Sequence, residues 1–509
     1  MSVGSEIDPD DRPGFEASDL DGEVLEVSPQ TFRQALDRTR RPDYRRWAEQ
    51  VDTTGGCSRP VRLVGHTTKV NELTGEVNSE YHSATEPDGV TYVRCGNRRA
   101  TICPSCSAEY KGDLWHLLVA GTTGGKGVPD TIRAHPLVFA TLTAPSFGAV
   151  HRAAKPGGPS RICRHRHAKR TCDHGRPQWC SRRHDTDVDL VGQPLCPDCY
   201  DYRGQLIWQW WAPELWRRFT IRLRRLLAIH VGVSEKRCRD LVRVQFAKVA
   251  EFQQRGAVHF HGLVRLDGPP VPGDEWPAPL VNVTAELLAT LIEQAATEVE
   301  YSTPNDGLEL PQLSLRFGTQ VDTRIVHEHA PETDLGTGDL RAETAAAYIA
   351  KYATKSTDDL NVGSERSNPH LTRLRDTIDT LAAAATPEPP DCDDPATVAP
   401  YARLGKWVHM LGFRGHFGTK SRNFSTTLGE LRRARRDWKA NAASGKPDLV
   451  QDLHTPDDAV SVADAILVIG SWRFAGMGWL TNGDAALAAD AAARARAHRL
   501  MRAGSRVAA

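Results

Sequence analysis

Two histidines separated by a single residue, His259 and His261, are the first side chains in this sequence that could do chemistry together. Apolar and polar residues alternate before the segment 253–256 and apolar residues follow it, which predicts a β-hairpin with Gly256 in its turn. Residues two apart in a strand point to the same face. The two imidazoles are therefore expected side by side, with Phe260 pointing into a core, and such a pair can share a divalent metal ion.

The His-x-His spacing alone is a weak signal, because the chain contains 19 histidines and the spacing recurs at His165/His167 and at His327/His329. A metal site on His327/His329 is kept as an alternative. His259/His261 is favoured by its strand context and by a chemically complementary segment further along the chain.

That segment is an alanine-rich run over residues 342–353, whose composition predicts a helix. Positions three, four and seven apart share one face of a helix. One stripe therefore carries two phenols and two ammonium groups, from Tyr348, Lys351, Tyr352 and Lys355. The alternative interpretation is an amphipathic helix with a solvated face.

A metal ion beside a tyrosine suits cleavage of a phosphodiester bond. An ion held by two imidazoles polarises a phosphate oxygen, and a tyrosine hydroxyl can then attack to form a phosphotyrosine link. The phenol has an ordinary pKa of about 10, and the ion and the ammonium group of Lys351 would favour the phenolate. Mg²⁺ or Mn²⁺ requires an oxygen ligand as well. Glu251 is the candidate, provided that it pairs with His259 rather than with Val258.

Eleven cysteines in a chain without a signal peptide point to structural zinc rather than to disulfides. Two Cys-x2-Cys pairs organise the predicted ligands. The first group is Cys95, Cys103 and Cys106, with the fourth ligand open among Cys57, Cys163 and His116. The second group is Cys196 and Cys199 with Cys172 and Cys180, and the completing ligands are open among Cys163, Cys172, His174, Cys180 and His184.

Lysine plus arginine and aspartate plus glutamate both number 64, so net charge gives no argument for a nucleic-acid partner. A neutral total can still hide a basic face. The helix expected over 213–230, with Pro213 in its first turn, carries Arg217, Arg218 and Arg222 away from its apolar stripe. These three arginines are predicted to contact a DNA backbone.

The late apolar run 466–480 is interrupted by Arg473 and is too short to span a bilayer. We therefore expect a cytoplasmic protein with no membrane partner. Composition and motif positions predict five regions: a disordered acidic N-terminus (1–45), a Cys-rich zinc module (46–130), a catalytic domain (131–370) with a zinc-ribbon-like insertion (160–202), a linker (371–400) and a basic helical C-terminal region (401–509).

The histidine and tyrosine segments, with the strand Phe139-Ala-Thr-Leu-Thr-Ala-Pro145, resemble the three motifs of the HUH endonucleases that initiate rolling-circle replication. The wider pattern resembles the RepSA-type replication initiators of actinomycete plasmids and integrative elements over roughly residues 55–430. The segments that carry this likeness are Cys95…Cys103-Pro-Ser-Cys106, Thr141-Leu-Thr-Ala-Pro-Ser-Phe147, Cys196-Pro-Asp-Cys199, Ala212-Pro-Glu-Leu-Trp-Arg217, Glu251-Phe-Gln…His261 and Leu411-Gly-Phe-Arg-Gly-His416.

The resemblance implies an α+β fold, in which an HUH-like antiparallel sheet is flanked by helices and carries zinc-binding insertions. It implies a nick at a plasmid origin, a 5′-phosphotyrosyl link and a free 3′-OH that a host polymerase extends, with a host helicase as a further partner. Both double- and single-stranded origin DNA are then partners. By this likeness Tyr352 is the first nucleophile and Tyr348 resolves the intermediate.

Two rival interpretations remain open from the sequence. A two-tyrosine transposase would share the site chemistry and differ in its target DNA. A zinc-dependent DNA-binding regulator would need the cysteines and no tyrosine.

Overall fold

The computed structural model divides the chain into two compact units, which are described separately. The first unit comprises residues 1–113 and 449–509, and the second comprises residues 114–448. The structure describes residues 28–71, 74–153, 162–164, 171–185, 189–304, 312–327, 340–352, 368–385, 401–443 and 466–507.

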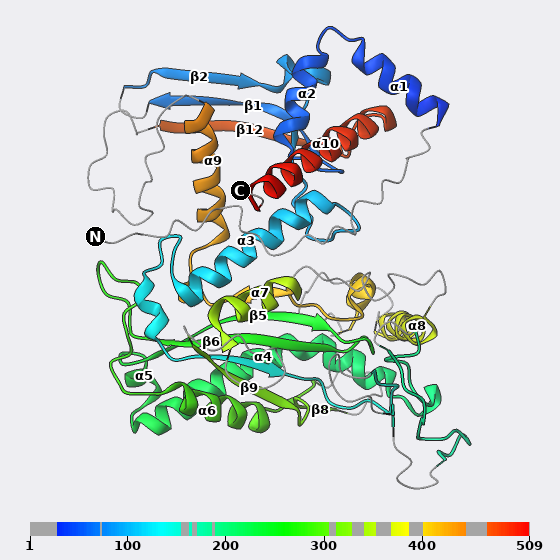
Figure 1. Ribbon diagram of the computed structural model, residues 1–509, viewed down its shortest axis with the longest axis vertical. Helices are drawn as coiled ribbons and strands as arrows, with labels where there is room; N and C mark the ends of the chain where they lie inside the picture. The colour runs from blue at the N-terminus through cyan, green and yellow to red at the C-terminus, as the bar shows by residue number, and fades with distance from the viewer. Residues whose placement is uncertain are drawn as a thin grey trace, which may run out of the picture. The chain divides into compact units, whose positions relative to one another are not determined.

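A six-stranded sheet in the order β10-β9-β4-β6-β5-β11 forms the centre of the second unit (Figure 1). All neighbouring strands are antiparallel except β9 and β10. The strands are β4 (Leu137–Leu142), β5 (Arg243–Phe252), β6 (Val258–Asp267), β9 (Val321–His327), β10 (Leu340–Arg341) and β11 (Gly418–Lys420). A separate pair is formed by β7 (Tyr301–Ser302) and β8 (Ser314–Leu315).

Helices cover both faces of this sheet, with α7 (Ala342–Tyr352) on one face and α4 (Tyr202–Val231) and α6 (Ala285–Glu298) on the other (Figure 1). Alternation along β6 divides its side chains between the two faces. Phe260 is fully buried toward α4, where its ring lies 5.6 Å from that of Trp216. The main hydrophobic core therefore lies on the α4 side, and the opposite face carries polar side chains such as His259 and His261 beside the buried Phe139 and Leu263.

The remaining helices of the second unit are α5 (Glu235–Cys238), α8 (Pro369–Ala384) and α9 (Leu428–Ala443). α3 (Pro104–Thr123) spans the boundary between the units. The short 3₁₀ helices are η2 (Ser83–Thr85), η3 (Pro87–Gly89), η4 (Asp130–Ala134), η5 (Pro197–Cys199), η8 (Leu404–Met410) and η9 (Arg422–Phe424).

In the first unit, β1 (Val61–Asn71) lies between β12 (Ile466–Met477) and β2 (Val77–His82) and also pairs with β3 (Thr91–Val93). The helices of this unit are α1 (Pro29–Thr39), α2 (Tyr44–Thr53) and α10 (Asn482–Val507). A buried ion pair joins α1 to α10, with Arg38 Nε 2.6 Å from Asp484 Oδ1. The first and the last helix that the structure describes thus belong to one unit.

The predicted region boundaries differ from these units. The predicted C-terminal region 401–509 is divided, because β12 pairs along β1 and carries residues 466–507 into the first unit. β12 is also a strand rather than a helix, since its run of Ile, Val, Trp and Phe suits a pleated sheet. Local sequence patterns could not show that β12 pairs with β1.

Two predicted unstructured regions contain helices. α8 occupies most of 371–385 in the predicted linker, and its buried residues Leu371, Leu374 and Ile378 follow helical spacing. α1 lies within the predicted disordered N-terminus 1–45. Residues 1–27 and 386–400 lie outside the described residues.

The arginine-bearing helix begins earlier than predicted. α4 starts at Tyr202, and the side chain of Asp201 accepts a hydrogen bond from Gly204 N as its N-cap. Pro213 is inside α4 instead of in its first turn. The preceding segment is apolar and buried, including Leu206, Ile207 and Trp208, so tertiary packing extends the helix through the proline. Among the described residues, no helix is both long and apolar enough to cross a bilayer.

Lys248 on β5 points into the core between the aromatic rings of Phe260 and Trp216, with Nζ 4.5 Å and 5.5 Å from their centroids. Burial lowers the pKa of its ammonium group to about 7. The unfolded chain therefore binds more protons than the folded chain between pH 7 and about 10.5, so this lysine makes stability rise with pH across that window.

We expect Lys248→Met to raise the melting temperature at pH 6 and to lose most of this advantage by pH 10. At pH 6, but not at pH 10, the folded wild-type chain buries a charged ammonium group. We therefore expect the melting temperature of the variant to exceed that of the wild type by about 4 °C or more at pH 6. Thermal unfolding at the two pH values checks the prediction, with exposed Lys236→Met as the control. The same difference in melting temperature between variant and wild type at both pH values would contradict the prediction.

Candidate active site and metal centres

The hairpin predicted around Gly256 is present as β5 and β6. Gly256 has a φ of 70°, and its N–H donates to Gln253 O at 2.7 Å. A Cβ at this position would also lie 2.9 Å from Leu411 Cδ1, so that side chain would have to move, and the positive φ itself favours glycine. The turn sets the register in which Glu251 lies opposite His259, and Val249 lies opposite His261.

Glu251, His259 and His261 converge on one point of the sheet face that α7 covers. Glu251 Oε2 is 2.8 Å from His259 Nε2 and 3.0 Å from His261 Nε2, and the two Nε2 atoms are 3.0 Å apart. His261 and Glu251 are nearly buried, with 3% and 13% of their side chains exposed. Three ligand atoms of the types predicted from the sequence are thus brought together.

The separations in this triad correspond to one face of an octahedron. Ligands at about 2.1 Å in adjacent octahedral positions lie about 3.0 Å apart, whereas tetrahedral positions would separate them by about 3.4 Å. The observed 2.8–3.0 Å suits the first arrangement. Three further positions would remain open to water or phosphate oxygens, as Mg²⁺ and Mn²⁺ sites require.

The electrostatics of the triad favour the protonation states that bind a cation. Burial lowers the pKa of His261 to about 4, which keeps its imidazole neutral at physiological pH. Burial would raise the pKa of Glu251, but the close interactions with His259 and His261 outweigh burial and lower that pKa to about 2. A neutral imidazole and an ionised carboxylate are both ready as ligands.

A hydroxyl on β4 orients one of the imidazoles. Thr141 Oγ1 lies 3.0 Å from His261 Nδ1, on the strand that pairs with β6 at this residue. When Nδ1–H donates to this oxygen, the lone pair of Nε2 faces the triad. On the other histidine, Gln253 Nε2 lies 3.4 Å from His259 Nδ1. The strand that resembles the first HUH motif therefore contributes Thr141 to the site.

The predicted tyrosine helix lies over this face as α7. The ring of Tyr348 is 5.1 Å from that of His261 at an angle of 88°, and the ring of Phe139 is 5.8 Å away. Ala346, Ile349 and Ala350 are buried behind it. Lys351 and Tyr352 belong to α7, but their side chains lie outside the described residues, as does Lys355.

The alternative metal site on His327/His329 has only one described member. His327 ends β9, and His329 lies outside the described residues, as do His165 and His167. His327 belongs to none of the described clusters of ligand atoms.

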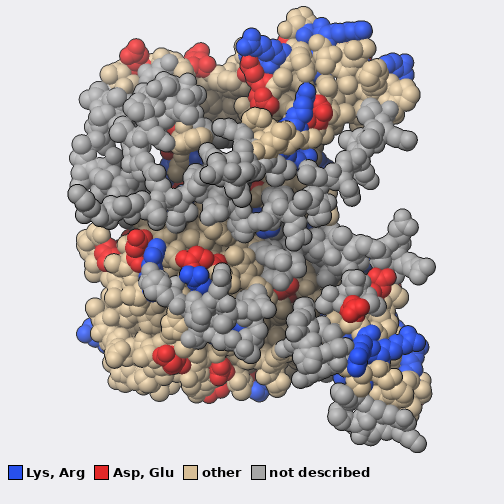
Figure 2. Space-filling model, viewed as in Figure 1, with Lys and Arg blue, Asp and Glu red and all other residues tan. Residues whose placement is uncertain are grey.

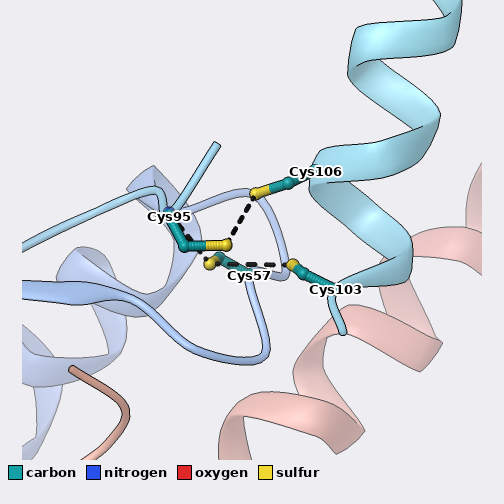
Figure 3. A group of neighbouring side chains, drawn as sticks. All are labelled: Cys57, Cys95, Cys103 and Cys106. Carbon is teal, nitrogen blue, oxygen red and sulfur yellow. Dashed lines mark hydrogen bonds between the residues drawn. The ribbon is translucent and has the colours of Figure 1, made fainter. Parts of the chain in front are cut away.

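Four thiols meet in the first unit, where Cys57 completes the predicted group Cys95, Cys103 and Cys106 (Figure 3). Cys95 Sγ is 3.7 Å from Cys106 Sγ, and Cys103 Sγ is 3.8 Å from Cys57 Sγ. Tetrahedral zinc with bonds of about 2.3 Å places its sulfur atoms about 3.8 Å apart. The geometry thus selects Cys57 among the three candidates and fits a structural zinc ion.

The second predicted cysteine group is wrong as a single set. Cys180 lies with His151, Cys163 and His184, whereas Cys172, Cys196 and Cys199 lie with His174. The spacing could not make this division, because all of the candidate ligands fall within one short segment. His151 was missed, since it lies before the predicted insertion 160–202 and no second ligand stands within a few residues of it.

The predicted DNA-contacting arginines of α4 are paired with carboxylates. Arg217 and Arg218 bond to Glu214 at 2.7 Å and 2.9 Å, and Arg222 bonds to Glu298. They border a pocket of about 340 Å³ together with Arg225. On the face drawn in Figure 2, lysines and arginines lie in more than one place, at the upper right as well as at the lower right. DNA contact by the α4 arginines stays a prediction.

The arrangement defines a mixed α+β protein with antiparallel sheets and several clusters of metal-ligating side chains. Residues 43–493 match the family described as "Replication initiator protein, pSAM2" (RepSA). A curated protein of Streptomyces ambofaciens, named "Replication initiator protein", is 40% identical over 473 residues, which cover 92% of this chain and 94% of that protein. The chain belongs to the RepSA family. A search of solved structures found no match.

We expect Thr141→Val to weaken binding of Mn²⁺ by about tenfold, because the variant cannot hold His261 with Nε2 directed at the triad. Glu251→Gln should weaken binding further, since it removes a charged ligand. Isothermal titration with Mn²⁺ measures both effects. Thr323→Val on neighbouring β9, whose hydroxyl bonds to Glu293, is the matched control. Equal affinity in the Thr141 and Thr323 variants would exclude the orienting role.

Proposed function

We propose that this protein initiates plasmid replication by nicking one DNA strand at the origin with a tyrosine nucleophile. The observation that carries the proposal is the contact between Tyr348 on α7 and His261 of the Glu251/His259/His261 triad. Membership of the RepSA family supports the initiator role. The product would be a 5′-phosphotyrosine link and a 3′-OH that primes rolling-circle synthesis.

The residues of the site have separate tasks in this reaction. His259, His261 and Glu251 would hold Mg²⁺ or Mn²⁺, which supplies charge stabilisation at the scissile phosphate. The attacking phenol loses its proton and forms a bond from Oη to phosphorus. The bond from phosphorus to O3′ breaks, and O3′ takes up a proton and leaves as the 3′-hydroxyl. Lys351, between the two tyrosines on α7, would favour the phenolate.

Two tyrosines one helical turn apart allow two successive attacks. Tyr352 is proposed as the first nucleophile and Tyr348 as the residue that resolves the covalent intermediate. Both positions lie on the same face of α7, because residues four apart in a helix are neighbours. The contact of Tyr348 with His261 supports a role for this residue close to the reacting phosphate.

The other proposed components support the reaction without touching it. Zn²⁺ held by Cys57, Cys95, Cys103 and Cys106 would stabilise the first unit. Double- and single-stranded origin DNA would be the substrate and partner, with Arg217, Arg218 and Arg222 of α4 as candidate phosphate contacts. A host helicase and a host polymerase would act on the nicked product in the cytoplasm.

Two alternatives make different demands on the same residues. A two-tyrosine transposase would use the triad and α7 on transposon ends, and family membership favours the initiator over it. A zinc-dependent DNA-binding regulator would not require the triad to face a tyrosine. The contact between Tyr348 and His261 therefore favours a nuclease.

Single-stranded origin DNA should become covalently attached to the protein in Mn²⁺ and should remain attached under denaturing electrophoresis. We expect Tyr348→Phe/Tyr352→Phe to reduce the adduct by about three orders of magnitude, because no nucleophile remains. Tyr110→Phe on α3 is the control. Adduct formation by the double variant at the wild-type rate would refute the assignment.

The single variants assign the two roles. If Tyr352 attacks first, Tyr352→Phe should abolish the initial adduct, and Tyr348→Phe should leave the adduct in place and impair its resolution. The opposite pattern would exchange the two roles. Mass spectrometry of the trapped peptide–oligonucleotide identifies the modified tyrosine directly.

A further inference from the structure

The segment from His151 to Cys199 contains two clusters of four metal-ligating side chains. Cluster A is His151, Cys163, Cys180 and His184, and cluster B is Cys172, His174, Cys196 and Cys199. In each cluster the four ligand atoms lie within 4.8 Å of one another. Along the chain, the ligands follow the order two from cluster A, two from cluster B, two from cluster A and two from cluster B.

The distances in cluster A match a tetrahedral site. His151 Nδ1 lies 3.2 Å from His184 Nε2 and 3.7 Å from Cys163 Sγ, and Cys180 Sγ lies 3.4 Å from His184 Nε2. Zinc bonds of about 2.05 Å to nitrogen and 2.3 Å to sulfur give tetrahedral edges of about 3.3 Å between nitrogens and 3.6 Å between nitrogen and sulfur. Each observed separation is close to the corresponding edge.

Backbone hydrogen bonds position the ligands of cluster A without a bound ion. Cys163 and Cys180 lie on two short antiparallel segments, joined by Arg164 N to Cys180 O at 2.9 Å and by Cys163 N to Arg182 O at 2.8 Å. His151 pairs with the segment that leads to Cys196, where its N–H donates to Gln193 O at 2.8 Å. One ligand of cluster A is therefore tied to the chain that carries cluster B.

Cluster B is built from two tight turns. Cys172 N donates to Arg176 O at 2.9 Å, which closes the turn that presents His174. Cys196 is the N-cap of η5 and Cys199 is its last residue, and His174 Nδ1 lies 3.2 Å from Cys199 Sγ. Three thiols and one imidazole are a ligand set of zinc sites in small domains.

This segment has little apolar packing to hold it together. Among the described residues between His151 and Cys199, Val191 is the one buried hydrophobic residue apart from the cysteine ligands. Segments without a sufficient core are stabilised by disulfides or metal ions. The cysteines in both clusters form no disulfide, so bound metal ions could add the stabilisation that a core would otherwise supply.

We propose that residues 151–199 bind two zinc ions in an interleaved cross-brace, one ion in cluster A and one in cluster B. Each ion would close a loop that contains ligands of the other, so neither half could unfold separately. With the Cys57/Cys95/Cys103/Cys106 group, the chain would hold three sulfur-bound zinc ions. The proposal does not depend on the nicking activity.

Counting the zinc ions bound to the full chain tests the proposal that residues 151–199 bind two of them. Native mass spectrometry and elemental analysis of the wild-type protein should give one zinc for the Cys57 group and two for residues 151–199. Cys180→Ser should remove the ion of cluster A and Cys199→Ser that of cluster B, so the double variant should lose two. A single site containing both cysteines would lose only one ion in the double variant, and that result would overturn the proposal.

Two further variants keep the test decisive if the serine variants fold poorly. His184→Cys replaces one zinc ligand by another and should retain the wild-type count, whereas His184→Ala should lose one ion. Cys238→Ser changes a buried cysteine on α5 outside both clusters and should lose none. The Cys57 group in the first unit provides the internal reference in every sample. A wild-type protein with one ion or none in residues 151–199 would also exclude the cross-brace.

Discussion

The pairing of Glu251 with His259 across the β5–β6 turn is the constraint on which the candidate active site depends. A slip of one residue would turn every side chain of one strand to the other face. Glu251 would then point toward α4 and leave the imidazoles without their carboxylate. Gly256 favours the observed register, because its positive φ of 70° suits the tight turn that joins the two strands. The conformation of this turn thus contributes to the choice of ligands.

The alternation of side chains along β6 gives the two faces of the sheet different roles. Phe260, between the two histidines, is fully buried against α4, while its neighbours face α7 and Tyr348. Rigid packing on one face is what allows three ligand atoms on the other to stay within 3.0 Å of one another. β4 serves both tasks, since Val138 and Ala140 join the core and Thr141 orients His261.

Long-range strand pairing and clusters of metal-ligating side chains occur outside the main hydrophobic core. In the first unit, β12 returns to β1 from the far end of the sequence, and four cysteines meet at the start of α3. In the second unit, the segment before α4 contains two clusters of cysteine and histidine. Its backbone turns place the ligands, and few apolar contacts would otherwise oppose its conformational entropy.

Local patterns determined the hairpin, the pairing of His259 and His261 on one face, the helix of Tyr348 and the Cys-x2-Cys pairs, because each depends on residues close in sequence. Only the tertiary structure decided the register of Glu251, the place of Tyr348 beside His261, the choice of Cys57 and the division of Cys172 from Cys180. It also decided that residues 466–477 form a strand paired with β1. These features depend on contacts between distant residues, and periodicity within one segment carries no information about its partner.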